Sequence, residues 1–298
     1  MAVVIGANSS GNCIATAIAS KVLPRKKGLA ITAIFVVLGL YLEGSKLDKA
    51  VAGGILSGTS APEIVILVTL AGAFVATALA TYFGMPVSTS QCLAVSFGLA
   101  SFYMGEALNL IYIKWMVFAW FATPVMAGFL SLIFYYAYFK FAKRVDSHHV
   151  TGTLPILMLT MTSIFAAYTL GANTGGFLVS IAGASGNQSV LLVSLLPIAI
   201  AIYFLSWPVI RTIGVGISEL GIVTATVSQL AAAIVMYVFT QYHIPTSLSL
   251  AIVGGVGGIG IGYGPGFKTL RRFGKIAAWW LVTPAVSGII SVMILYLL

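Results

Sequence analysis

Charged residues are scarce in this chain: Asp, Glu, Lys and Arg together make up 7% of its 298 residues. In soluble proteins roughly a quarter of all residues are charged, so the composition excludes an ordinary water-soluble domain. The two cysteines, Cys13 and Cys92, lie in apolar runs, which favours small buried hydrophobes over a disulfide or a metal pair. Neither a carboxylate pair nor a nucleophile with a nearby base stands at membrane depth, which argues against an intramembrane enzyme.

Apolar residues dominate instead: they make up 60% of the chain, and the mean hydropathy is +1.07. The chain contains ten apolar segments, most of which approach the roughly 20 residues that span a bilayer as a helix. They cover about 2–20, 28–42, 64–83, 86–104, 113–139, 154–184, 190–207, 217–241, 245–262 and 276–298. The pattern predicts an all-α polytopic integral membrane protein.

Three phrases of the sequence occur twice and in the same order. Their offsets are 165, 159 and 160 residues, which indicates one ancestral unit used twice. The pairs are Gly6–Ser20 with Gly171–Ser185, Pro86–Ser90 with Pro245–Ser249, and Trp120–Gly128 with Trp280–Gly288. We expect a first transmembrane repeat at 1–139, a basic cytoplasmic linker at 140–153 and a second transmembrane repeat at 154–298.

Five crossings in each repeat would place the second repeat upside down relative to the first, the inverted arrangement of many transporters. The basic residues agree with this orientation, because cytoplasmic loops are rich in Lys and Arg. Twelve then lie inside and three outside, with both termini outside. The inside set is Lys21, Arg25, Lys26, Lys27, Lys140, Lys143, Arg144, Arg211, Lys268, Arg271, Arg272 and Lys275; the outside set is Lys46, Lys49 and Lys114.

Two features predict irregular helices. The segment 154–184 is too long for one simple crossing, so we expect a helix broken at Gly171–Asn173 or a re-entrant hairpin. Pro86 and Pro245 each precede Ser and Thr residues, a signal for a helix that begins within the membrane. We therefore expect broken or re-entrant helices at both kinds of motif.

Polar side chains in these segments are costly unless paired, which makes them candidates for a site. Helix N-termini carry free N–H groups and about half a positive charge, so with hydroxyl and amide donors they suit a small anion. The anion-binding candidates are Asn8, Ser9, Ser10, Asn12, Ser88, Thr89, Ser90, Gln91, Asn173, Thr174, Thr246, Ser247 and Ser249. Interhelical packing is the alternative role for such residues. Glu43 and Glu219 are candidates for coupling, although both lie near segment ends.

These motifs resemble those of the inorganic phosphate transporter (PiT) family. GANSSGN at Gly6–Asn12 and GANTGGF at Gly171–Phe177 are similar to its GANDVAN motif, and PVSTSQ and PTSLSL to its Pro-Ser motif. The resemblance implies a symporter-type permease that moves inorganic phosphate by alternating access. Ser9 and Thr174 stand where the family has Asp, and Gln91 and Leu250 where it has His.

The missing Asp residues leave the substrate and the coupling ion open. Sulfate or another tetrahedral oxyanion is the alternative to phosphate, and the coupling cation is either sodium or a proton. An anion channel and a non-transporting sensor are further alternatives. We expect no cofactor, no metal and no nucleic-acid partner. The expected partners are a small inorganic anion and the lipid bilayer, with homo-oligomerisation open, and the compact loops favour a prokaryotic cell membrane.

Overall fold

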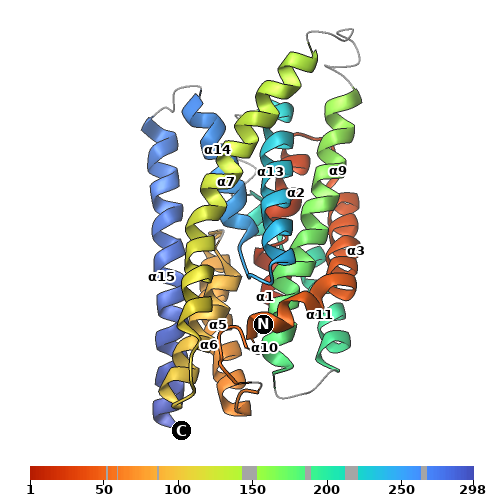
Figure 1. The fold of residues 1–298 in the computed structure, drawn as a ribbon. Helices are drawn as coiled ribbons and strands as arrows, with labels where there is room; N and C mark the ends of the chain where they lie inside the picture. The colour runs from red at the N-terminus through yellow and green to blue at the C-terminus, as the bar shows by residue number, and fades with distance from the viewer. Residues whose placement is uncertain are drawn as a thin grey trace.

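The computed structural model describes residues 1–51, 53–58, 60–85, 87–142, 153–184, 189–211, 221–262 and 267–298. Within these ranges the regular structure is helical, apart from one isolated bridge between Leu56 and Leu108. The helices form an elongated bundle (Figure 1). The predicted all-α class is confirmed, whereas most of the expected linker and Glu219 lie outside the described residues.

Each half of the chain supplies a similar series of helices. The first half has α1 (Ala2–Asn8), α2 (Gly11–Ala19), α3 (Arg25–Glu43), η1 (Gly44–Leu47), α4 (Asp48–Val51), α5 (Glu63–Tyr82), α6 (Thr89–Tyr103) and α7 (Leu110–Ala142). The second half has α9 (Thr153–Leu170), η2 (Gly171–Gly175), α10 (Gly176–Ala182), α11 (Val190–Leu205), α13 (Gly221–Gln241), α14 (Leu248–Gly262) and α15 (Phe267–Leu297).

The expectation of ten crossings is too high. Seven segments of the described chain are long and apolar enough to cross a membrane. The helices α6 and α14 have 15 residues each and α11 has 16, all short of the roughly 20 that a bilayer requires. The helix α5 packs against α6, and α13 against α14. The first pair lies in the lower half of the bundle and the second in the upper half (Figure 1).

The two GAN segments distort a helix without reversing it. Residues 171–175 form a π-helical turn between α9 and α10, and the whole stretch Thr153–Ala182 qualifies as one candidate span. Between α1 and α2, the backbone of Ser10 keeps right-handed helical angles, with φ −67° and ψ −27°. The expected irregularity is present at Gly171, but a hairpin is not. A π-turn absorbs an extra residue within a continuous helix, which explains the difference.

The two halves interlock. The last helix of the first half, α7, packs against α14, and the last helix of the second half, α15, packs against α6. Likewise α1 packs against α11, and α3 against α9. Gly6 permits the close packing of α1 against α11, since a Cβ there would lie 2.6 Å from the Ile198 carbonyl oxygen. Gly171 permits the packing of η2 against α3, since a Cβ there would lie 1.9 Å from the Val36 carbonyl oxygen.

Candidate functional site

The helices α6 and α14 both begin inside the bundle, at the Pro-Ser motifs. Ser88 is the N-cap of α6: its Oγ accepts the Gln91 backbone N–H at 3.3 Å and its carbonyl accepts the Cys92 N–H at 3.1 Å. In α14 the Ser247 carbonyl accepts the Ala251 N–H at the same 3.1 Å. Each helix therefore directs its first N–H groups, which have no intrahelical partners, toward the interior of the protein.

Two serines hold these helix starts against each other. Ser90 donates its hydroxyl to the Thr246 carbonyl at 2.5 Å, and Ser249 donates to the Val87 carbonyl at 3.2 Å. Each bond runs from the helix of one half to the turn of the other. All four residues are buried. The two N-termini consequently converge on one region of the core, where their partial positive charges add.

Asn8 fixes the turn that leads into α6. Its amide donates to Thr81 Oγ1 at 2.8 Å and to the Met85 carbonyl at 3.1 Å, while its Oδ1 accepts the Val87 backbone N–H at 3.3 Å. The side chain is completely buried. With both donors and one acceptor position used within the protein, Asn8 positions the Pro-Ser turn.

Asn173 does the same for the turn that leads into α14. It donates to Thr240 Oγ1 at 2.9 Å and to the Ile244 carbonyl at 3.1 Å, and it accepts the Thr246 N–H at 2.9 Å. Every partner lies 159 residues after its counterpart in the first half. Thr81 and Thr240 were missed as site residues, although that shared spacing was a signal that could have identified them.

The other candidates of the first half lie on the same wall. Ser9 Oγ is 3.0 Å from Thr89 Oγ1, and Asn12 Nδ2 donates to Ser249 Oγ at 2.7 Å. Ser10 Oγ instead donates to the Gly6 carbonyl of its own helix turn. Thus Ser9 and Asn12 adjoin the helix starts, whereas the Ser10 hydroxyl is used locally.

The helix α7 adds a residue that was not among the candidates. Thr123 Oγ1 lies 2.7 Å from Thr246 Oγ1 and also donates to the Ala119 carbonyl at 2.6 Å. The indole of Trp120 donates to the Pro245 carbonyl at 3.2 Å. The repeated phrase Trp120–Gly128 contains both residues and was a signal that could have identified Thr123.

No charged side chain is buried among those that the structure describes; the buried polar residues are Asn, Gln, Ser and Thr only. Gln91 is 7% exposed, and its Oε1 accepts no hydrogen bond within the described chain. Thr174 is buried within the π-turn. The region is rich in donors and holds no fixed negative charge, which suits an anion.

Glu43 lies elsewhere, at the C-terminal end of α3. Its carboxylate accepts from Lys46 Nζ at 2.8 Å, from the Tyr168 hydroxyl at 2.7 Å and from Gln241 Nε2 at 3.0 Å. These contacts join α3 to α9 and α13. Among the described residues, Glu43 makes no direct hydrogen bond to the Pro-Ser turns or to the first turns of α6 and α14, and Glu219 lies outside the described residues.

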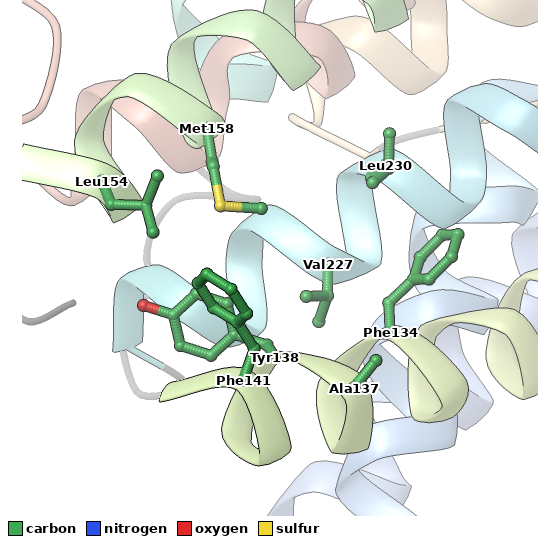
Figure 2. Close-up of a pocket in the computed structure, with 8 residues that line it drawn as sticks. All are labelled: Phe134, Ala137, Tyr138, Phe141, Leu154, Met158, Val227 and Leu230. Atoms are coloured by element: carbon green, nitrogen blue, oxygen red, sulfur yellow. The ribbon is translucent and has the colours of Figure 1, made fainter. Parts of the chain in front are cut away.

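A pocket of about 330 Å³ lies between α7, α9 and α13 (Figure 2). Its lining is apolar except for the Tyr138 hydroxyl, and it comprises Phe134, Ala137, Tyr138, Phe141, Leu154, Met158, Val227 and Leu230. An anion buried there would lose its hydration without gaining donors. The pocket is therefore unsuited to a small anion, which the first turns of α6 and α14 could bind.

Comparison with known proteins agrees on one family. The model of the phosphate transporter family matches residues 5–291. A protein of Methanocaldococcus jannaschii named as a phosphate permease is 27% identical over 98% of this chain and 92% of its own length. One of Haemophilus influenzae with a similar name is 23% identical over 100% and 94% of the two chains.

A sodium-dependent phosphate transporter of Plasmodium falciparum is 35% identical, but only over 45% of this chain and 21% of its own length. The solved structure of a protein titled the sodium-dependent phosphate transporter superposes with a TM-score of 0.81 at 17% sequence identity. The match covers 100% of this chain and 97% of that one. At this identity the likeness shows the fold.

Proposed function

The chain belongs to the phosphate transporter family and is a multi-pass membrane permease, and from that premise we propose that it binds inorganic phosphate between the starts of α6 and α14 and carries it by alternating access. The observation that carries this proposal is the reciprocal pair of bonds from Ser90 to the Thr246 carbonyl and from Ser249 to the Val87 carbonyl. They bring two helix N-termini together in a buried region without fixed charge. Such termini bind phosphate through backbone N–H groups.

We further propose that the two halves are inverted repeats. The equivalent bonds of Asn8 and Asn173 support this, as does the exchange of α7 and α15 between the halves. The pairs α5–α6 and α13–α14 lie in opposite halves of the bundle (Figure 1). A placement of equivalent pairs in opposite halves is what an inverted arrangement requires.

Uptake of an anion into a negative-inside cell requires a co-ion, because each charge costs about 2.3 kcal/mol per 100 mV. We propose sodium, since relatives of this chain are named sodium-dependent phosphate transporters. The neutral oxygens of Ser9 and Thr89, 3.0 Å apart, are the candidate ligands beside the anion. A proton is the second candidate, because this chain has Ser9 and Thr174 where the family pattern has carboxylates. The same loss keeps sulfate as the second substrate candidate.

The test is uptake of labelled phosphate and labelled sulfate into proteoliposomes with an imposed sodium or proton gradient. Phosphate uptake driven by sodium is expected. Sulfate uptake driven by protons, with phosphate inert, would replace both the substrate and the co-ion of the proposal. Counterflow completes the test, because a carrier exchanges internal for external anion, whereas a channel shows no such stimulation and a sensor moves nothing.

Removing a helix-cap hydroxyl tests the site itself. Ser88→Ala and Ser247→Ala are each expected to raise the KM for phosphate by roughly tenfold, as a lost bond to a charged ligand does. The measurement is initial uptake against phosphate concentration, normalised to the amount of folded protein. An unchanged KM in both variants would contradict the site.

A further inference from the structure

Gln91 has an acceptor atom that the fold does not use. The phrase Ser88-Thr89-Ser90-Gln91 has the form of a capping box, in which the first and fourth residues bond each other reciprocally. One half of the box is present, since Ser88 Oγ accepts the Gln91 N–H at 3.3 Å. The other half would use Gln91 Oε1, yet this buried atom has no hydrogen-bond partner in the described chain.

The position of Gln91 on α6 places this acceptor at the anion site. It is the third residue of the helix, and helical side chains lean back toward the N-terminus. Its amide therefore lies over the first turn, beside the N–H groups that would bind the anion. Three hydroxyls in the described chain are likewise buried and unpartnered, namely Thr69, Ser101 and Ser228, but none lies in the first turn of α6 or α14.

An amide oxygen matters here because it can only accept, whereas the Ser and Thr hydroxyls of the site can rotate to donate or to accept. Sulfate at neutral pH is an acceptor only, whereas the hydrogen phosphate dianion has the same charge and shape but keeps one O–H. Hydroxyls that adapt to either ion distinguish them poorly. A site that pairs a substrate O–H with a buried acceptor rejects an analogue without that O–H, because the acceptor is then left unpaired.

We propose that Gln91 Oε1 accepts the O–H of hydrogen phosphate and thereby selects phosphate over sulfate. This inference rests on the proposed anion site at α6 and α14. The equivalent residue of the second half is Leu250, which is buried and has no polar group, so the selection comes from one half only.

The test compares anions that differ in this one group. Monofluorophosphate near neutral pH is a dianion like hydrogen phosphate, with fluorine in place of the O–H. Unlabelled phosphate, monofluorophosphate and sulfate compete with labelled phosphate for uptake by the wild type, Gln91→Met and Gln91→Leu. Methionine keeps the length of glutamine, and leucine copies the second half. Leu250→Met is the matched control, an apolar swap of similar volume.

In the wild type, phosphate is expected to compete at least about tenfold better than the two anions without an O–H. In both Gln91 variants the KM for phosphate should rise roughly ten- to a hundredfold, and this preference should approach one. Leu250→Met should keep the wild-type preference. Because the preference is a ratio within each variant, expression level does not enter it.

Other outcomes contradict the proposal. One such outcome is an unchanged preference for phosphate over the anions without an O–H in Gln91→Met or Gln91→Leu. The Gln91 amide would then cap the helix or bind the cation, whether or not stability or sodium dependence changes. If neither variant folds, the wild type still tests the inference. Equal competition by phosphate and monofluorophosphate would overturn the role of Gln91 and leave the proposed function intact. A wild type that takes up no phosphate would instead overturn the proposed function.

Discussion

The two halves of the chain share their framework and differ in the groups around the proposed anion site. Asn8 and Asn173 make the same three hydrogen bonds to equivalent atoms. In contrast, Asn12, which bonds Ser249, corresponds to Phe177 in the second half. Gln91 likewise corresponds to Leu250. The repeated residues shape the turns, so we infer that the unrepeated ones determine what binds.

Phe177 illustrates how the second half uses its position. The ring is fully buried and belongs to an apolar cluster that includes Cys92, Leu93 and Phe97 of α6. An aromatic side chain at this place stabilises by packing, by about 1.5–3 kcal/mol for a fully buried ring. Asn12 at the equivalent place gives a hydrogen bond across the two halves instead. The second half is therefore the more apolar wall of the site.

The largest expected effect comes from removing the shared framework. Asn8→Ala and Asn173→Ala each leave a buried backbone N–H without its acceptor and two oxygens without their donor. Each orphaned group costs about 1–3 kcal/mol, so the three together predict a loss of at least about 3 kcal/mol and strongly reduced uptake in either variant. Thermal unfolding in detergent and phosphate uptake measure the two effects.

Equal losses in the two variants would support a symmetric framework. Ser10→Ala is a suitable control, because the Ser10 hydroxyl donates to the Gly6 carbonyl within its own helix turn. If Asn8→Ala unfolds while Asn173→Ala keeps wild-type stability, the two residues are not equivalent. That result would contradict the inverted-repeat proposal.

A smaller and unequal effect is expected from the reciprocal serines. Ser249→Ala removes the donor to the Val87 carbonyl and the acceptor of Asn12, whereas Ser90→Ala removes only the donor to Thr246 among strong bonds. With about 1 kcal/mol for each bond, Ser249→Ala should be the more damaging by that amount. Unfolding free energies of both variants test this order.

The double variant Asn12→Ala with Ser249→Ala sharpens the result. If the 2.7 Å bond couples the halves, the two losses are not additive, since the second change removes an interaction that is already gone. Additive losses within about 0.5 kcal/mol would show that Asn12 and Ser249 act independently.

The duplicated phrases predicted the central elements of the fold because each encodes a local requirement. Pro245 followed by Thr and Ser predicted a helix start, and α14 begins at Leu248. The number of crossings was overestimated because an apolar run does not show how much of it becomes helix: α6, α11 and α14 have only 15 or 16 helical residues. The partners of Asn8 and Asn173 could not be assigned from the sequence. Each amide bonds residues at least 67 positions away, so its partner is determined by how the helices pack.

Glu43 gives the smallest expected effect, and it tests whether asymmetry outside the site matters. Only the first half supplies this carboxylate, which connects Lys46 with Tyr168 and Gln241 of the second half. Its side chain is 16% exposed and that of Lys46 is 34% exposed, so the ion pair is partly screened by solvent. We expect Glu43→Gln to lower stability by about 1 kcal/mol or less, because the amide keeps the shape and part of the hydrogen bonding.

Phosphate uptake in this variant should keep its dependence on the driving cation, measured with sodium and proton gradients in turn. If uptake at normal expression no longer depends on the driving cation, Glu43 is a coupling group. The functional difference between the two halves would then lie at the end of α3, away from the Pro-Ser turns.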